Sequence, residues 1–239
     1  MSKDSFETHG SPSSFFGVLV VSLVLLVVFS LGFAPVVFLL FLINWSGVCS
    51  VWWFWLILPV MVYIGLVLII VAQLLISGGV IRVFHLWYEP GVHPYQFSDR
   101  QARRWMLVCA LYTPCRKIME VFPIAQLKNP YFRLLGMQVG KNTLVGGVIK
   151  DPCLTRIGCN STIGEYAVIY GHITNYQRGT IDMRPVVIGD NCVIGAGAFI
   201  LPGAHIEDDV TVAAGAVVTS NQVLKRNKVY AGIPAKVIR

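Results

Sequence analysis

One histidine of the sequence, His172, lies where it could accept a proton during a reaction. It falls at a break in a regular repeat, where the chain should leave the repeated structure and form an exposed excursion. A neutral imidazole in such a place can act as a general base toward a hydroxyl or an amine. A solvent-exposed loop histidine is the alternative for this residue taken alone. His205 directly precedes a residue expected to point inward, so we expect it at the surface or in a subunit contact.

A catalytic base needs a neighbour that holds its ring in position. The nearest polar candidates in the sequence are Glu165, Asn175 and Tyr176, and the sequence does not choose between them. The six cysteines form no C-x-x-C pair and have no companion histidine at zinc-binding spacing, so we expect no metal and mostly buried, reduced thiols.

The repeat that His172 interrupts has a period of six residues and occupies the chain after Met137. Aliphatic side chains recur in two registers, and a small or short side chain stands two residues before most of them. Such a six-residue face suits a flat-sided parallel β-helix in which each coil stacks on the last. The first register holds Val139, Val145, Ile157, Ile163 and Ile169, and the second holds Ile188, Ile194, Ile200, Ile206, Val212 and Val218.

Two features depart from this regularity. Asp151 is the exception among the expected aliphatic positions. The spacing from Ile169 to Ile188 is nineteen residues, which is not a multiple of six, so one register ends and another begins. We therefore expect a loop at about residues 172–185. Several glycines follow the aliphatic positions, where we expect bends, namely Gly140, Gly158, Gly164, Gly189 and Gly195.

Charge divides the chain into two parts. It is 55% hydrophobic and 13% charged, and there is no Asp, Glu, Lys or Arg between Glu7 and Arg82. Two apolar blocks, Phe15–Ile43 and Val51–Ile76, each exceed the roughly 20 residues that cross a bilayer core as a helix. We expect two transmembrane helices, the first bent or broken at Pro35. A secretory signal is the alternative for the first block, but its length, the lack of an evident cleavage site and the second block disfavour it.

Basic residues predict the orientation. The turn between the apolar blocks has none, whereas the segment after the second block has several, so both termini and the repeat should be cytoplasmic. The net charge of +7 is explained more simply by juxtamembrane attraction to anionic lipid than by nucleic acid, which we do not expect as a partner. Neither apolar block contains an ionisable group that would mark an ion pathway, which disfavours a channel or receptor.

A connector joins the membrane part to the repeat. Ser98 and Gln101 resemble a capping box, so a helix should run from about Asp99 to Phe122, with a kink or break near Pro114. This helix could lie along the membrane surface or pack between membrane and repeat. A short helix should follow from Asn129–Leu135. The expected domains are thus a leader (1–14), a transmembrane hairpin (15–79), the connector (80–136) and the repeat domain (137–239).

The repeat region resembles the hexapeptide-repeat acyltransferases, a family with a left-handed β-helix that includes galactoside, serine and xenobiotic acetyltransferases. The resemblance rests on Tyr170-Gly171-His172, on Pro185–Asp190 and on the ending Ala231–Arg239. Upstream, residues 87–91, 103–105 and 131–136 show a weaker likeness to the membrane-embedded tail of ε-poly-lysine synthetase-type enzymes. Those tails carry acidic residues soon after the histidine, where Asn175 and Tyr176 stand here. The left hand of the coil is implied by the family alone.

The resemblance implies a membrane-anchored acetyltransferase in which His172 deprotonates a hydroxyl or amine acceptor that then attacks acetyl-CoA. The acceptor would be a small or lipid-linked molecule. The family's grooves lie between subunits, which implies a homotrimer. The residues implied for acetyl-CoA are the backbone amides of Ala196 and Ala214 at the pantetheine arm, Thr219 near the adenine, and Lys236 with Arg239 facing the phosphates.

Two other functions compete with this interpretation. A β-helix can serve as a non-catalytic binding or scaffold protein at the membrane, because fold does not determine function. A β-helix carbonic anhydrase would need a set of zinc-binding histidines, and only His172 and His205 lie in the repeat.

Overall fold

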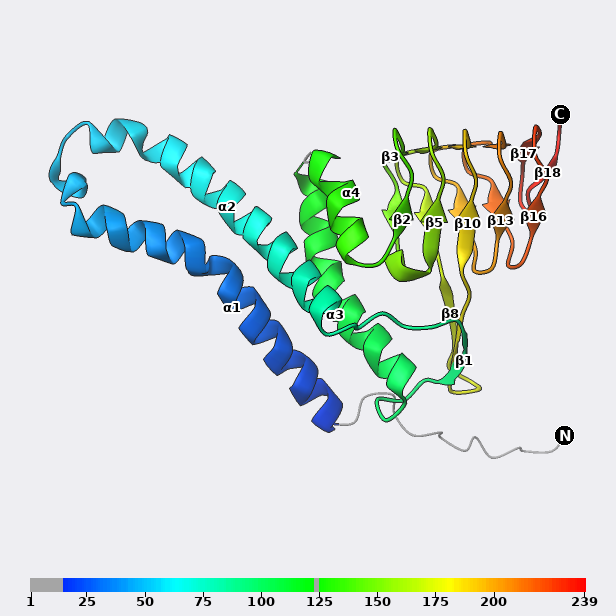
Figure 1. Ribbon diagram of the computed structural model, residues 1–239, viewed down its shortest axis with the longest axis horizontal. Coiled ribbons are helices and arrows are strands. Elements are labelled where there is room, and N and C mark those ends of the chain that lie inside the picture. Colours follow the sequence, from blue (N-terminus) through cyan, green and yellow to red (C-terminus); the bar gives the residue numbers. More distant parts are fainter. Residues whose placement is uncertain (1–14, 123–124) are drawn as a thin grey trace, which may run out of the picture.

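The computed structural model describes residues 15–122 and 125–239, so the expected leader of residues 1–14 lies outside the described part. A long helical hairpin, a group of shorter helices and a coil of short strands follow one another along the chain (Figure 1). The shorter helices lie between the hairpin and the coil.

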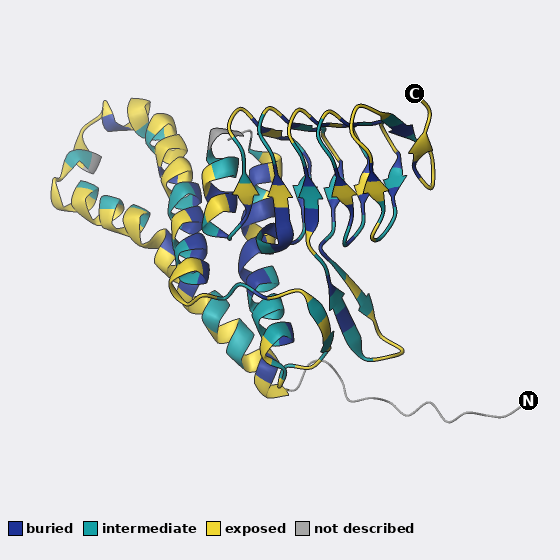
Figure 2. Cartoon of the chain, turned by 45° about the vertical axis from the view of Figure 1, so that its right-hand side comes forward, coloured by how far each residue is buried: buried dark blue, intermediate teal, exposed yellow. Residues whose placement is uncertain are grey.

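The hairpin consists of α1 (Phe15–Trp45) and α2 (Phe54–Val83), joined by a turn that contains η1 (Val48–Ser50). Both helices are long and apolar enough to cross a membrane, with a mean hydropathy of 2.8 in their most apolar stretches. Figure 2 shows that much of their surface is exposed, and many of the exposed side chains are large and apolar. Pro35 lies inside α1 and does not end it, although Figure 1 shows α1 bent along its length.

A polar contact ties the two long helices together. The Gln73 side chain of α2 is buried, and its Nε2 donates a hydrogen bond of 2.7 Å to the carbonyl oxygen of Phe29 in α1. A Cβ at Gly32 would overlap the Gln73 amide, so the absence of a side chain there makes room for this contact. This hydrogen bond satisfies Nε2 of the buried amide, whereas Oε1 of Gln73 has no hydrogen-bond partner among the described residues.

The connector forms β1 (Gly91–Pro94), α3 (Arg100–Val121) and α4 (Ala125–Leu134). The capping box expected from Ser98 is wrong, because Asp99 is the N-cap and its carboxylate accepts from the backbone N–H groups of Gln101 and Ala102, each at 2.9 Å. A carboxylate also interacts favourably with the positive end of the helix dipole. The Gln101 side chain instead accepts a hydrogen bond from the backbone of Glu89.

Helix α3 packs between the hairpin and the coil. It continues through Pro114 without a break, and it buries apolar side chains along its length. The Tyr112 hydroxyl donates 2.7 Å to the carbonyl oxygen of Ile149 in the coil. Helix α3 therefore packs between the hairpin and the repeat, and its position along the membrane surface stays a prediction. Helix α4 is already formed at Ala125, earlier than expected from Asn129, and Gly136 after it has a positive φ of 91°.

The repeat domain is a three-sided coil in which the chain visits three parallel sheets in rotation. The first sheet has the order β16-β13-β10-β5-β2, the second β17-β14-β11-β6-β3 with β18 added antiparallel to β17, and the third β15-β12-β7-β4. The strands are β2 (Gln138–Val139), β3 (Leu144–Val145), β4 (Val148–Ile149), β5 (Thr155–Ile157), β6 (Thr162–Ile163), β7 (Val168–Ile169), β10 (Val186–Ile188), β11 (Val193–Ile194), β12 (Phe199–Ile200), β13 (His205–Ile206), β14 (Thr211–Val212), β15 (Val217–Val218), β16 (Val223–Leu224), β17 (Val229–Ala231) and β18 (Lys236–Val237). The left hand of the winding stays a prediction of the family resemblance.

The aliphatic residues of both registers fill the inside of the coil as expected. All are buried except Val139 in the first coil, which is partly buried. The five glycines that follow these residues lie at the corners between strands, as expected. Close packing explains Gly158. Gly158 does not have a positive φ; a Cβ there would lie 2.6 Å from the carbonyl carbon of Gly189 in the next coil. Its glycine is therefore required by the close approach of neighbouring coils.

Asparagine and aspartate take the left-handed backbone at one corner of the coil. Asn160, Asn191 and Asp209 have φ between 54° and 58° and stand one above another in successive coils. Asn160 donates to Asn191 at 3.3 Å, and Asn191 donates to Asp209 at 3.1 Å. Short polar side chains tolerate this conformation better than other non-glycine residues, and here they also bond to each other.

The register break contains a hairpin rather than an irregular loop. Strands β8 (His172–Asn175) and β9 (Thr180–Met183) pair antiparallel, within the range expected for the excursion. Strand β1 of the connector pairs with β9, from Gly91 opposite Met183 to Pro94 opposite Thr180, so a three-stranded sheet joins connector and coil.

The close approach of coils at Gly158 predicts a stability difference between two glycine substitutions. Gly158→Ala should lower the free energy of unfolding by about 1–3 kcal/mol, because the added methyl has to push neighbouring backbone apart. Gly197→Asn should cost about 1 kcal/mol or less, since Gly197 has a φ of 67° that asparagine tolerates and open space around it. Thermal unfolding of the detergent-solubilised proteins, followed by circular dichroism, measures both. Equal losses would contradict this explanation.

Candidate active site

A buried carboxylate holds the ring of His172. The Nδ1 atom of His172, the first residue of β8, lies 2.7 Å from Oδ2 and 2.9 Å from Oδ1 of Asp151. Asp151 follows β4 and is fully buried, whereas 17% of the His172 side chain is exposed. An ionised carboxylate only accepts hydrogen bonds, so in a neutral His172 a proton on Nδ1 would bond to Asp151 and leave the lone pair on Nε2. The pair thus has the arrangement of a base and its orienting group.

The Asp151 carboxylate receives further hydrogen bonds from two parts of the chain. From the coil, the backbone N–H of Gly171 donates to Oδ2 at 2.7 Å. From the connector, the Tyr88 hydroxyl donates to Oδ1 at 2.8 Å and the Trp105 indole Nε1 at 3.3 Å. A buried charge is tolerated only when such donors replace water. The carboxylate is therefore fixed in position and direction.

The local sequence around Asp151 supports this position. Its own carbonyl oxygen accepts a hydrogen bond of 2.9 Å from the Thr155 hydroxyl, across the short helix η2 (Pro152–Leu154). A Cβ at Gly171 would lie 2.8 Å from the Cβ of Asp151. The glycine that precedes His172 therefore lets the chain pass close enough for its N–H to reach the carboxylate.

Aromatic side chains surround the imidazole. The ring of Trp105 lies edge-on to His172, with centroids 4.8 Å apart. Tyr95, which follows β1, lies 5.9 Å from the Trp105 ring and 5.7 Å from the ring of Tyr176 at the hairpin tip, again edge-on. The connector thus supplies one wall of the site, and the hairpin that begins at His172 supplies another.

Burial keeps the neighbouring weak acids protonated. It is the main cause that raises the pKa of Tyr88 well above its usual value, with the negative charge of Asp151 as the second cause. Burial also raises the pKa of the Cys153 thiol to about 12, and it raises the pKa of the Cys109 thiol strongly. Tyr88 therefore remains a hydrogen-bond donor, and neither thiol is a nucleophile near neutral pH.

The three candidates expected to orient His172 have other partners. Glu165 lies at the exposed corner between β6 and β7, where its carbonyl oxygen accepts from Gly197 of the next coil. The Asn175 side chain accepts from the backbone N–H of Arg178, and Tyr176 is exposed beside Tyr95. The hydrogen-bonding partner of His172 is Asp151. The signal that could have identified it was the single polar residue in an aliphatic register.

The residues expected at acetyl-CoA lie elsewhere on the coil. Ala196 and Ala214 are exposed at the same corner of successive coils, in one stack with Glu165; the carbonyl oxygen of Ala196 accepts from Gly215 at 2.9 Å. Thr219 follows β15, and its hydroxyl donates to the Gln222 side chain at 3.1 Å. Lys236 and Arg239 are exposed at the end of the chain. Their roles toward a cofactor stay predictions. His205 is exposed, as expected.

Similarity to known proteins covers both the coil and the region before it. Residues 185–220 match the hexapeptide repeat of succinyl-transferase. WcaF of Escherichia coli, provisionally named a colanic acid biosynthesis acetyltransferase, is 31% identical over 169 residues, which cover 68% of this chain and 89% of WcaF. YJL218W of Saccharomyces cerevisiae, provisionally named an acetyltransferase, is 41% identical over 97 residues, or 38% of this chain. This chain spans about half, 48%, of the yeast protein.

The similarity extends upstream of the repeat. Delta-poly-L-ornithine synthetase of Acinetobacter baumannii is 27% identical over 164 residues, which cover 67% of this chain and 12% of that protein. This match agrees with the weaker likeness, noted above, between the segment before the repeat and the tail of ε-poly-lysine synthetase-type enzymes. The match to WcaF is longer than the repeat domain and so includes part of the connector or hairpin. Together with the three-sided coil, the similarity over most of WcaF shows that this chain belongs to the hexapeptide-repeat acetyltransferase family.

Proposed function

We propose that the chain is a membrane-anchored acetyltransferase that transfers the acetyl group of acetyl-CoA to a hydroxyl or amine, with His172 as the general base. The observation that carries this proposal is the contact between His172 Nδ1 and the buried carboxylate of Asp151. Family membership supports acyl transfer, and the pair supplies the base that such a transfer needs.

In the proposed transfer, the proton of the acceptor moves first to His172 and then to the sulfur of coenzyme A. Nε2 of His172 takes the proton of the acceptor as the acceptor oxygen or nitrogen attacks the thioester carbonyl carbon. The carbon–sulfur bond then breaks, and the imidazolium returns the proton to the sulfur, which releases free coenzyme A. Asp151 stabilises the transient imidazolium, and the donors Tyr88 and Trp105 prevent the carboxylate from turning away.

Acetyl-CoA would lie along the coil, in a groove completed by a second subunit. Ala196 and Ala214 leave backbone exposed at one corner, where a pantetheine arm can approach closely; Thr219 would lie near the adenine, and Lys236 with Arg239 near the phosphates. We propose a left-handed coil and a homotrimer, as in the resembling family. Exposed apolar side chains of the second sheet, among them Leu144 (58% exposed) and Val193 (45%), support a subunit contact on the outside of the coil.

The hairpin of α1 and α2 would anchor the enzyme in the bilayer, with the repeat domain and both termini in the cytoplasm. The exposed apolar surface of the hairpin supports the anchor. Four tryptophans lie around the turn between α1 and α2. They support a position of this turn at the membrane surface away from the repeat domain, because indole rings favour the headgroup level. They are Trp45, Trp52, Trp53 and Trp55.

Removal of the imidazole tests the base. His172→Ala should lower acetyl transfer by about 10²–10⁴-fold, the usual contribution of a positioned base. The matched control, His205→Ala, removes an exposed imidazole from the same coil and should leave the rate within about twofold of the unchanged protein. Release of coenzyme A from acetyl-CoA, with membrane extract as the source of acceptor, measures both. Equal rates for His172→Ala and the unchanged protein would refute the mechanism and favour a scaffold role.

Exchange of the carboxylate for an amide tests the orienting role. Asp151→Asn should lower kcat by about 10²–10⁴-fold, because an amide N–H facing Nδ1 favours the wrong tautomer and does not stabilise the imidazolium. The KM for acetyl-CoA should change little, since Asp151 does not face the proposed groove. Tyr88→Phe removes one donor to the same carboxylate and should cost about 3–30-fold. Full activity of a folded Asp151→Asn protein would contradict the assignment.

A further inference from the structure

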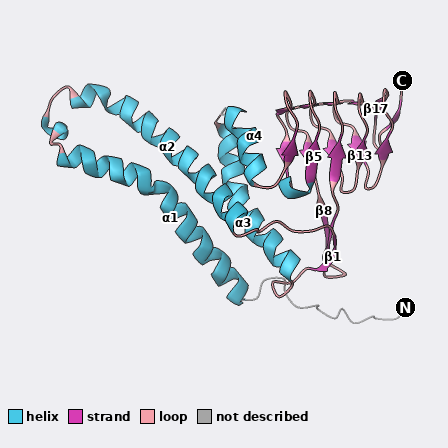
Figure 3. Cartoon of the chain, viewed as in Figure 1, coloured by secondary structure: helices cyan, strands magenta, loops and turns pink. Residues whose placement is uncertain are grey.

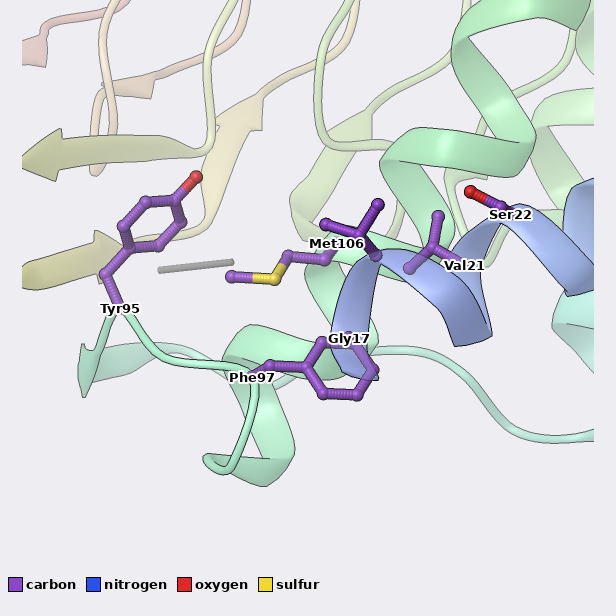
Figure 4. Close-up of a pocket in the computed structure, with 7 residues that line it drawn as sticks. Gly17, Val21, Ser22, Tyr95, Phe97 and Met106 are labelled. Carbon is purple, nitrogen blue, oxygen red and sulfur yellow. The ribbon is translucent and has the colours of Figure 1, made fainter. Parts of the chain in front are cut away.

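A pocket lies between the first long helix and the connector. It has a volume of about 360 Å³, within the range of small-ligand sites. Gly17, Val18, Val21 and Ser22 of α1 form one wall, and Tyr95, Phe97 and Met106 of the connector form the other. Figure 4 shows Phe97 against α1 near Gly17 and the Met106 side chain directed toward Tyr95.

The α1 wall belongs to a helix whose own exposed surface is apolar. Val18 is 53% exposed, and the described part of α1 carries no charged residue. A Cβ at Gly17 would lie 2.8 Å from the Phe97 ring, so the first described turn of α1 rests directly on the connector. A ligand in the bilayer can therefore reach this pocket along α1.

The other wall leads to the catalytic pair. Tyr95 lines the pocket and also contacts Trp105, with ring centroids 5.9 Å apart. Trp105 in turn lies 4.8 Å from the ring of His172 and donates to Asp151. Only two ring contacts separate the pocket from the base. The contact of Tyr95 with Tyr176 places the tip of the β8–β9 hairpin beside the same aromatic side chains.

We infer that this pocket binds the alkyl or prenyl chain of a membrane-borne acceptor, so that the hydroxyl or amine of its head group lies at His172. The inference rests on the proposed function and names the substrate class of that site. Lipid is as apolar as the pocket, so transfer of the chain from the bilayer adds little hydrophobic free energy. The pocket instead positions the acceptor, and confinement to the membrane raises its concentration near the base.

A photoreactive amphiphile tests the pocket directly. The probe is a dodecyl glucoside with a diazirine at the end of its alkyl chain, added to the full chain in lipid nanodiscs, with labelled peptides identified by mass spectrometry. We expect label on the peptides that contain Phe97 and Met106. Val21→Trp fills the pocket and should reduce that label by about tenfold or more. Leu23→Trp is the matched control, because Leu23 lies exposed on the same helix outside the pocket lining.

Turnover with membrane extract provides the second measurement. Val21→Trp should lower kcat/KM for the acceptor about tenfold or more, whereas Leu23→Trp should change it less than about twofold. Label spread over the exposed faces of α1 and α2 without enrichment at Phe97 and Met106 would overturn the inference, as would a Val21→Trp protein with reduced label and full turnover. His172→Ala should keep the label and lose turnover. A labelled wild-type protein without turnover would refute the proposed function instead.

Discussion

The candidate active site depends on a single buried carboxylate. Asp151 is inside the coil at a place where the other register positions hold aliphatic side chains, and a charge there is stable only if each oxygen has donors. The coil provides the N–H of Gly171 and the imidazole of His172, and the connector provides Tyr88 and Trp105. Undocking the connector would leave the carboxylate with part of its hydrogen bonds, so the connector and the coil are energetically coupled through it.

Further contacts extend this coupling to the long helices. The hydroxyl of Ser77 in α2 lies 3.2 Å from the Cys115 sulfur of α3 and 3.1 Å from the Tyr131 hydroxyl of α4, and all three residues are buried. Strand β1 is paired to the hairpin that carries His172. His172 and Asp151 are therefore held at a fixed distance from the helical hairpin by packed elements rather than by a flexible linker.

The sequence predicted the repeat domain well because the six-residue period recurs in every turn of it. Each repeat gives independent support for the same inward positions. The excursion at His172 was predicted by the same arithmetic. The partner of His172 was not, because closeness in sequence favours residues next to His172, whereas the coil brings Asp151 to it from 21 residues away. Strand β1, which adds to the β8–β9 hairpin, and the helix cap at Asp99 were missed for a related reason. Short segments carry weak local signals, and their tertiary partners determine their conformation.

The structure separates the two sides of the proposed reaction between two kinds of architecture. A regular coil offers repeated corners with small side chains, which suits a long donor that is the same in every turnover. The proposed acceptor side would be built from α1, the Tyr95–Phe97 segment, α3 and the excursion, none of which is constrained by the six-residue period. Changes there can alter the acceptor without disturbing the stacked coils, whereas changes at Asp151 or its donors alter the base itself. The irregular elements should therefore determine which acceptor is used. The buried carboxylate of Asp151, which joins them to the coil, should determine whether acetyl transfer takes place at all.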